Sequence, residues 1–468
     1  MNLRHLSLLA LMALLMGLAT VSCSRQGELL DTVPADVSAV ATVDFKKLCE
    51  ASGITFTSEG IKADDKINGG VRGDLREMLD RMARLDSEGV ADFSRVAVAV
   101  AGDGAQYVTF AISDYGKLKE QAGEWLEWQP DADGYHVADV GDGCTFLCSS
   151  SQAWLVNDVR GSATKALEGL LKRAGEMPVT KLDGVMQALS RENIANIAVA
   201  SGFISFATDK KSDTEIPAQD KEWNVASLNT GADNSLVAEW ETMQSTGRTV
   251  KVKGMQNINP ALLAYVPEDY SVTFAAGLTP EFNWKPLEQL ALAVGGFQAG
   301  AFMAVVNPFL ESINGSVLIA AKPLSEYALA EGDPSDWDFI VMAHMPQDKI
   351  NSLMTMIATM MSTAGIAPSV NEDGMMVVPQ YGKNLYIGNV DGYLGISTKE
   401  FDNSRNNSLA PTFVNKDMAF ATAFPMDGGV TIDASVSMTS GKGQAKFKVD
   451  GTDSPTLMYL LSILLSKS

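Results

Sequence analysis

Few residues of this 468-residue sequence have the types and spacing that catalysis or metal binding requires. Beyond residue 22 the histidines are His136 and His344, and they fall at different places in the sequence pattern. Because there are only two such histidines, at non-equivalent places, they do not indicate a metal site built from two or three imidazoles. A Ser-His-Asp triad would need one of them, and the sequence contains no Gly-x-Ser-x-Gly motif. We therefore predict no metal site, no cofactor and no catalytic residue, and we interpret both histidines as structural.

Acidic residues are the remaining candidates for chemistry. Glu124, Glu127, Asp131 and Asp133 lie close together, and a carboxylate pair at a fixed separation can hydrolyse glycosidic bonds. Sequence spacing does not set that separation, and the formal net charge of −21 favours a solvated acidic surface. The segment Asp131-x-Asp133-Gly134 is partly similar to a calcium loop, but its glycine is fourth rather than sixth. We interpret it as a hairpin turn.

Sulfur and aromatic side chains are further candidates for chemistry. Eight of the 22 methionines lie between residues 342 and 376, and thioethers suit Cu(I), but their helical spacing favours a core role. Trp125 and Trp128 are three residues apart on an expected helix, where packing is favoured over stacking on a sugar. Cys49, Cys144 and Cys148 are odd in number, so we expect buried, inert thiols rather than a disulfide framework.

The N-terminus has the composition of an export signal. Arg4 and His5 precede an apolar run over residues 6–18, which is too short for a permanent membrane span. The following Ala19-Thr20-Val21-Ser22-Cys23 resembles a bacterial lipobox, and Thr20, where leucine is usual, makes it similar to lipoproteins of Bacteroidota. The resemblance implies a signal peptide over residues 1–22, lipidation of Cys23 and attachment to a membrane through that lipid.

Residues 23–32 are expected to form the lipidated tether. Within it, Asp31-Thr32-Val33 resembles the Asp-Thr/Ser-aliphatic acceptor for O-glycans in Bacteroidota, which makes Thr32 a candidate glycosylation site. Arg25 is followed by few acidic residues, so an acidic surface-export signal is weak. We therefore expect an outer membrane lipoprotein that faces the periplasm rather than the cell surface.

A motif that occurs twice organises the rest of the chain. Val33-Pro34-Ala35-Asp36-Val37-Ser38 returns as Val266-Pro267-Glu268-Asp269-Tyr270-Ser271, an offset of 266 − 33 = 233 residues. Later segments match in the same order, which predicts repeat unit 1 over 33–265 and repeat unit 2 over 266–468. Aligning Met243 with Met438 leaves a polar insertion at about 208–233, interpreted as a mobile loop or a partner-contacting loop.

The coarse pattern of elements favours an α+β fold. Alternating segments predict strands over 38–45, 95–101, 107–112, 135–140, 144–148 and 153–156. Residues 60–74 are expected to form a loop. Helical spacing predicts helices over 46–52, 75–82, 115–128, 162–174 and 348–361. We predict two tandem pseudo-repeated units of mainly antiparallel sheet with packed helices.

These features together resemble an uncharacterised lipoprotein family of Bacteroidota, a domain of unknown function. The resemblance implies location and architecture and carries over no catalytic residue. We expect a non-catalytic, lipid-anchored cell-envelope protein with a binding or envelope-assembly role, whose partner is an envelope protein or a glycan. The acidic charge disfavours nucleic acid. The alternative is a histidine-poor hydrolase or glycan-acting enzyme that uses carboxylates in a cleft between the units.

Overall fold

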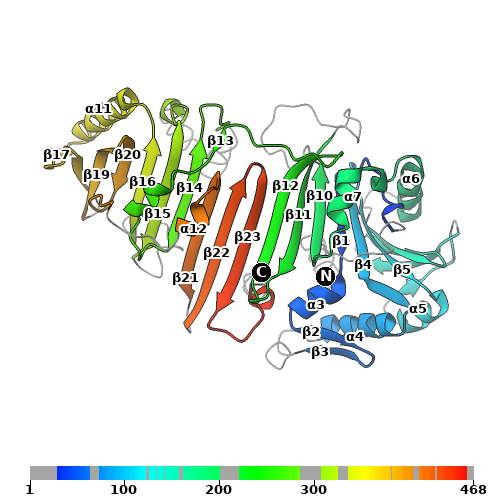
Figure 1. The fold of residues 1–468 in the computed structure, drawn as a ribbon. Coiled ribbons are helices and arrows are strands. Elements are labelled where there is room, and N and C mark those ends of the chain that lie inside the picture. The colour runs from blue at the N-terminus through cyan, green and yellow to red at the C-terminus, as the bar shows by residue number, and fades with distance from the viewer. Residues whose placement is uncertain are drawn as a thin grey trace. The chain divides into compact units, whose positions relative to one another are not determined.

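The structure is a computed structural model. It describes residues 29–63, 73–122, 126–132, 134–141, 143–157, 162–200, 221–284, 307–324, 336–380, 382–403, 410–426 and 429–460. The chain divides into two compact units (Figure 1). Unit 1 comprises Met1–Val250 and Thr452–Ser468, and unit 2 comprises Lys251–Gly451. In the described part of the chain, no helix has the length and apolar character needed to cross a membrane.

Unit 1 is built on an antiparallel sheet whose strands pair in the order β9, β5, β4, β1, β10, β11 and β12. Strands β6, β7 and β8 continue the sheet from β9 as a meander, and β2 and β3 form a separate hairpin. The bounds are β1 Ala39–Val43, β2 Ile54–Thr57, β3 Gly60–Ala63, β4 Ala91–Val100, β5 Gln106–Ile112, β6 Glu127–Trp128, β7 His136–Gly141, β8 Cys144–Cys148, β9 Gln152–Asn157, β10 Ala195–Ala200, β11 Glu222–Thr230 and β12 Leu236–Gln244.

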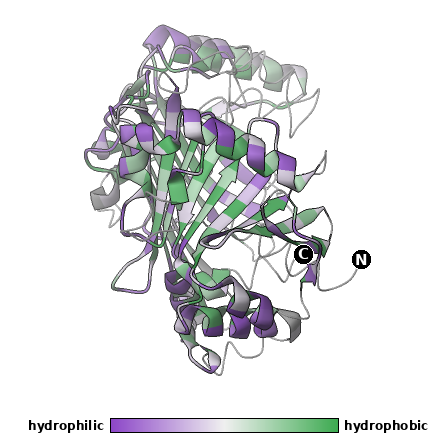
Figure 2. Cartoon of the chain, turned by 90° about the vertical axis from the view of Figure 1, so that its right-hand side faces the viewer, coloured by the Kyte–Doolittle hydropathy of each residue, from purple (hydrophilic) through white to green (hydrophobic). Residues whose placement is uncertain are grey.

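Helices cover both faces of this sheet. Successive side chains of a strand point to opposite faces, so neighbouring residues contact different helices. On β5, Tyr107 packs in the core cluster that includes residues of α6 Ala163–Glu176 and α7 Asp183–Leu189. Its neighbour Val108 faces α4 Gly73–Ser87 and α5 Tyr115–Ala122. The short helices α3 Phe45–Ala51 and η2 Val179–Lys181 complete the unit. In Figure 2, hydrophobic and hydrophilic residues alternate along the helices and along the strands.

Unit 2 has the same order of pairing. Its strands run β20, β16, β15, β14, β21, β22 and β23, and β17, β18 and β19 lead into β20 as a meander. The bounds are β13 Met255–Gln256, β14 Val272–Leu278, β15 Gly315–Pro323, β16 Trp337–His344, β17 Ser369–Val370, β18 Met376–Gln380, β19 Lys383–Val390, β20 Tyr393–Ser397, β21 Met418–Met426, β22 Val430–Thr439 and β23 Lys442–Asp450, with η5 Pro260–Tyr265, α11 Gln347–Thr363 and α12 Ala410–Phe413.

The two copies of the sequence motif form the same turn, each directly before the central strand of its sheet. In unit 1 the Val37 backbone N–H donates to the Pro34 carbonyl oxygen at 3.5 Å. In unit 2 the Tyr270 N–H donates to the Pro267 carbonyl oxygen at 3.1 Å. The second and fifth positions of the motif therefore have the same structural role in both units.

The correspondence begins before the motif, within the segment that was expected to form the tether. Leu29 and Leu30 lie within the expected tether over 23–32, and both side chains are buried in the unit 1 core. The Val33 N–H donates to the Leu30 carbonyl oxygen, and the Val266 N–H donates to the Leu263 carbonyl oxygen, both at 3.1 Å. Apolar side chains at the end of a polar segment thus anchor the chain to the core.

The prediction of an α+β fold with mainly antiparallel sheet is confirmed, and three local predictions are wrong. Of the helix expected over 115–128, α5 is described over Tyr115–Ala122, whereas Glu127 and Trp128 form β6. Residues 60–63 of the expected loop form β3. Residues 222–230 of the expected insertion form β11, where Trp223 is fully buried; residues 208–220 lie outside the described residues.

The division into compact units differs from the predicted repeat boundaries. It falls at 250/251 and 451/452, whereas the repeat was placed at 265/266 and extended to residue 468. Residues 456–460 are helical and begin with the buried Thr456 and Leu457. Met243 lies in β12 and Met438 in β22, which occupy different places in the two pairing orders. The alignment behind the insertion was therefore displaced by one strand.

Candidate functional site

An apolar pocket of about 180 Å³ lies within unit 1, between α4 and the sheet. Fourteen of its fifteen lining residues are apolar, and the other is Arg81. An apolar cavity of about 150 Å³ in another protein stays dry and binds benzene. The pocket therefore has room for a group of that size, such as a small ring or the end of an aliphatic chain.

Two simple periodicities create the lining. On α4, Met78, Arg81, Met82 and Leu85 recur at i, i+3, i+4 and i+7, which places them on one side of the helix. On β5 every second residue faces the pocket, and these are Val108 and Phe110. The amphipathic pattern over 75–82 was recognised in the sequence, but the surface opposite it comes from strands distant in the chain.

A row of aromatic rings runs from the pocket wall toward α5. The ring centroids of Phe93 and Phe110 are 5.1 Å apart, and those of Phe110 and Phe146 are 6.3 Å apart. Phe146 contacts Trp128 edge to face at 6.2 Å, and Trp128 contacts Tyr115 at 5.5 Å. Trp128 is therefore a packing residue next to the pocket wall, which confirms the packing interpretation of its ring; Trp125 lies outside the described residues.

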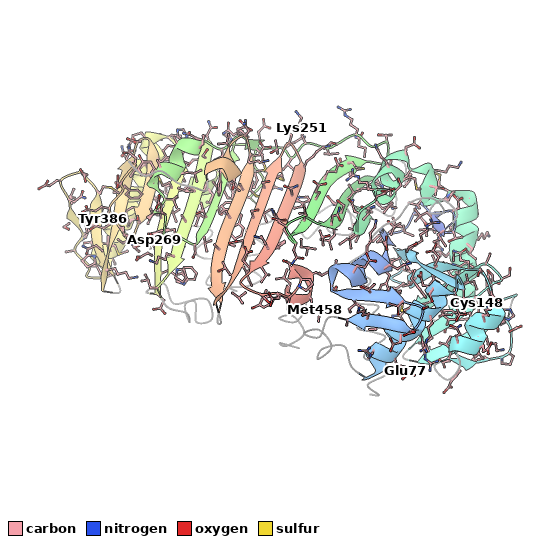
Figure 3. All side chains as sticks on the ribbon, turned by 60° about the horizontal axis from the view of Figure 1, so that its bottom comes forward. Glu77, Cys148, Lys251, Asp269, Tyr386 and Met458 are labelled. Carbon is pink, nitrogen blue, oxygen red and sulfur yellow. The ribbon has the colours of Figure 1, made fainter. Side chains whose placement is uncertain are left out.

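The charge of the one polar lining residue is compensated. The Arg81 guanidinium donates to the Gln121 carbonyl oxygen at 2.8 Å and to the carboxylate of Glu77 at 2.9 Å. The Gln121 amide in turn donates to Glu88 at 2.9 Å. These bonds join α4 to the end of α5 (Glu77 is labelled in Figure 3). Because Glu77 balances the guanidinium, the pocket favours an uncharged ligand over an anionic one.

A Cys-His-Asp arrangement lies near the same strands. His136 Nδ1 is 2.9 Å from Asp131 Oδ1, and its ring stacks on Tyr115 at 3.6 Å. His136 is opposite Cys148 in the β7–β8 register (Cys148 is labelled in Figure 3). Burial raises the pKa of the Cys148 thiol to about 12, with the charge of Asp131 adding to the effect and Lys119 opposing it. The thiol is therefore protonated at neutral pH and is not an activated nucleophile.

Of the carboxylates considered in the sequence, Glu124 and Asp133 lie outside the described residues. A different pair was missed, Asp433 on β22 and Asp450 on β23. Burial raises the pKa of Asp433, and the charge of Asp450 and a hydrogen bond between the two side chains raise it further. Hydrogen-bonded carboxyls are closer than the roughly 5 Å used in glycoside hydrolysis. In the β22–β23 register Asp433 is opposite Lys448, so Asp450 is its diagonal neighbour, which the spacing of the two residues in the sequence does not show.

Two residues were predicted to be modified, Cys23 by a lipid and Thr32 by a sugar. Cys23 lies outside the described residues. Thr32 is half-buried, and its hydroxyl donates to the Leu29 carbonyl oxygen at 2.6 Å and accepts from the Gln152 amide at 3.1 Å. Attachment of a sugar replaces the hydroxyl hydrogen, so glycosylation of Thr32 requires the bond to Leu29 to be lost.

The sulfur-containing residues are mostly part of the core. The free thiols of Cys49, Cys144 and Cys148 are buried, which confirms that prediction. Of the clustered methionines, Met342 is fully buried, whereas Met360 is 59% exposed. Among the described residues, no three His, Cys, Asp or Glu side chains are grouped as metal ligands. His344 hydrogen-bonds through Nδ1 to a backbone carbonyl oxygen.

A second, polar groove of about 580 Å³ lies on unit 1. Its polar lining comes from α3, from the end of β11 and from the turn after β11: Lys47, Glu50, Asn229, Thr230 and Asn234. No aromatic ring lines it, although stacking on aromatic faces is a usual part of sugar binding. It offers hydrogen bonds but no feature that selects a ligand.

Comparisons with known proteins do not assign a family. No protein-family model and no curated protein match the chain. Two solved structures, described as crystal forms IV and III of TP0453, are similar to it with TM-scores of 0.27 and 0.28 and sequence identities of 6% and 8%. Each match covers 46% of this chain and 79% of the other. Similarity at this level supports no argument about function.

Proposed function

We propose that this protein is a non-catalytic, lipid-anchored cell-envelope protein that binds an apolar ligand in the pocket of unit 1. The observation that carries the proposal is the lining, in which fourteen apolar side chains surround the space and the charge of Arg81 is balanced by Glu77. Apolar surface withdrawn from water is the main driving force for such binding. The part of the ligand inside the pocket is an uncharged hydrocarbon group.

The proposed location supplies such a ligand. A chain tethered by a lipid on Cys23 at the periplasmic side of the outer membrane is surrounded by acyl chains. Burial of each methylene group contributes about 0.8 kcal/mol, so a few methylenes within the 180 Å³ pocket give weak, reversible binding. An envelope protein or a glycan remains a proposed macromolecular partner, and the formal net charge of −21 disfavours nucleic acid.

We also propose that the two units are pseudo-repeats of one ancestral unit. Both sheets share one order of strand pairing, from β9 to β12 and from β20 to β23. Both motif copies make the same turn before the central strand. The bond from Ala200 to the Ser38 carbonyl oxygen, at 2.9 Å, corresponds to the bond from Ala423 to the Ser271 carbonyl oxygen, at 3.0 Å.

The enzyme alternative is supported by one observation, the raised pKa of Asp433 beside Asp450. A raised carboxyl pKa is a feature of general acids. The hydrogen bond between the two side chains weighs against a glycosidase arrangement, since that arrangement needs space between the carboxyls. Binding is therefore the better-supported function.

Calorimetry with a neutral and an anionic ligand of equal chain length tests the proposal. The full mature chain carrying Cys23→Ala is titrated with octan-1-ol and with octanoate. We expect octanol to bind with a negative heat-capacity change and octanoate to bind no more tightly, because the Arg81 charge is already compensated.

A pair of matched variants places the ligand. Val108→Phe fills the pocket from β5, and Val370→Phe makes the same change at a side chain that is 70% exposed on β17. We expect Val108→Phe to weaken octanol binding by about tenfold, the loss of roughly 1.4 kcal/mol, and Val370→Phe to leave it unchanged. Equal binding by both variants, or no binding by the parent chain, would refute the proposal.

A further inference from the structure

The surface of α11 in unit 2 lacks charge over an unusual length. No Asp, Glu, Lys or Arg occurs in the 21 residues from Asn351 to Asn371, in a chain of which 20% of residues are charged. This segment covers most of α11, the loop after it and β17 (Figure 1). Solvent-facing helical surfaces ordinarily carry charged residues, so this composition requires a reason.

Burial does not provide that reason. Of the 17 residues of α11, only Ile350 is classed as buried. Leu353, Ile357 and Met361 are half-buried against the core. Met360 is 59% exposed and Val370 on β17 is 70% exposed, the two highest values among the large apolar side chains of the described residues. The uncharged segment therefore presents apolar side chains to solvent.

Four hydroxyl groups of α11 are hydrogen-bonded within the helix. The hydroxyl groups of Ser352, Thr355, Thr359 and Thr363 each donate to the carbonyl oxygen four residues earlier, at 2.8 to 2.9 Å. A hydroxyl that donates to its own helix loses no donor when water is removed. Covering the uncharged part of this surface therefore desolvates no charge, and it leaves these four hydroxyl hydrogens with their partners.

We propose that this neutral face, formed by α11 and residues 364–371, is the contact through which two copies of the chain associate. A two-fold contact places the same patch of both copies against itself. In a chain of formal net charge −21, most patches would bring acidic side chains against acidic side chains. The neutral face avoids that repulsion, whereas a basic partner would prefer the acidic surface elsewhere.

The size of the neutral face sets the expected strength. A helix of 17 residues is roughly 25 Å long and about 10 Å wide, which gives about 250 Å² of contact surface. Stable interfaces bury about 800 Å² on each partner. The association is therefore weak and concentration-dependent, and confinement on a membrane, as proposed above, would favour it by raising the local concentration.

Sedimentation of the full mature chain carrying Cys23→Ala, from micromolar to millimolar concentration at low and high salt, tests the proposal. We expect the weight-average mass to rise toward that of a dimer, more steeply at high salt. Thr359→Lys and Met360→Lys place an unpaired charge on the neutral face and should weaken association by about tenfold or more. Gln187→Lys, at an exposed position of α7 in unit 1, adds the same charge and should not weaken it.

The sign of the effect separates a specific contact from general repulsion. Each lysine lowers the net negative charge, so an association governed by overall charge would become stronger in all three variants. A monomer at every concentration, or a dimer that Thr359→Lys and Met360→Lys leave intact, overturns the proposal. Binding of the parent chain to neutral lipid vesicles with no dimer in solution also overturns it and assigns the face to a membrane. These outcomes are independent of octanol binding in unit 1.

Discussion

The chain upstream of the first motif should be part of the unit 1 core, and Leu30→Ala tests this. The Leu30 side chain is fully buried in the cluster that includes Trp154 and Trp223. Leu→Ala substitutions at buried sites cost about 3–5 kcal/mol, through lost burial and the cavity left behind. Alanine preserves the carbonyl oxygen that accepts from Val33, so the loss measures the side chain alone. We expect a destabilisation in that range.

Urea unfolding followed by tryptophan fluorescence provides the measurement, because two of the seven tryptophans lie in the same cluster as Leu30. Leu263→Ala is the counterpart in unit 2, where Leu263 is 1% exposed, and Leu324→Ala, at a side chain that is 46% exposed, is the control. We expect Leu263→Ala to destabilise unit 2 by a similar amount and Leu324→Ala to change stability by less than about 0.5 kcal/mol. A loss below about 1 kcal/mol for Leu30→Ala would show that residues 29–30 belong to the tether.

Two further predictions concern backbone packing and thiol chemistry. Gly184→Ala should destabilise the fold by about 1–3 kcal/mol, since its Cβ would lie 2.2 Å from the Gly247 nitrogen. Gly175→Ala on α6, where the added Cβ meets nothing within 4 Å, should stabilise the fold by up to about 1 kcal/mol. Thermal unfolding of both variants is the measurement. Because burial raises the pKa of Cys148 to about 12, the folded chain at pH 8 should react with N-ethylmaleimide far more slowly than the urea-unfolded chain, and equal rates would contradict the buried thiol. The stabilisation from this neutral thiol is complete below its unfolded pKa and is lost as pH rises toward about 12, so Cys148→Ala should flatten that alkaline loss.

The hydrophobic pattern of the sequence predicted several strands and helices correctly. The apolar segment before Lys46 forms a strand that is buried along its whole length, and the helical spacing around Met78 becomes a helix. Strand β11 was missed because its residues looked polar, yet Trp223, Val225 and Ser227 are buried at every second position. Alternation was the correct signal there, and the number of charged residues was a misleading one.

The pocket was not predictable in the same way. Its lining begins at Phe45 and ends at Leu155, and only the pairing of β4, β5, β8 and β9 brings these segments together. Each residue has the spacing of an ordinary core position. Periodicity alone therefore predicts that these side chains are buried, but it does not predict that a cavity remains between them. The volume left between α4 and the sheet depends on side-chain shape, which apolar patterning does not specify.

The two units share one order of strand pairing but differ in the length and surface of one helix. The helix between β5 and β6 is α5, with 8 residues, and the helix at the same place between β16 and β17 is α11, with 17. At 1.5 Å per residue these helices are about 12 Å and about 25 Å long. The shorter one supplies Leu118 to the pocket of unit 1. Eight residues therefore suffice for this connection, and the additional length of α11 includes Thr359 and the exposed Met360. Since the sheet does not require that additional length, the neutral face is better explained by a contact outside unit 2 than by the needs of its core.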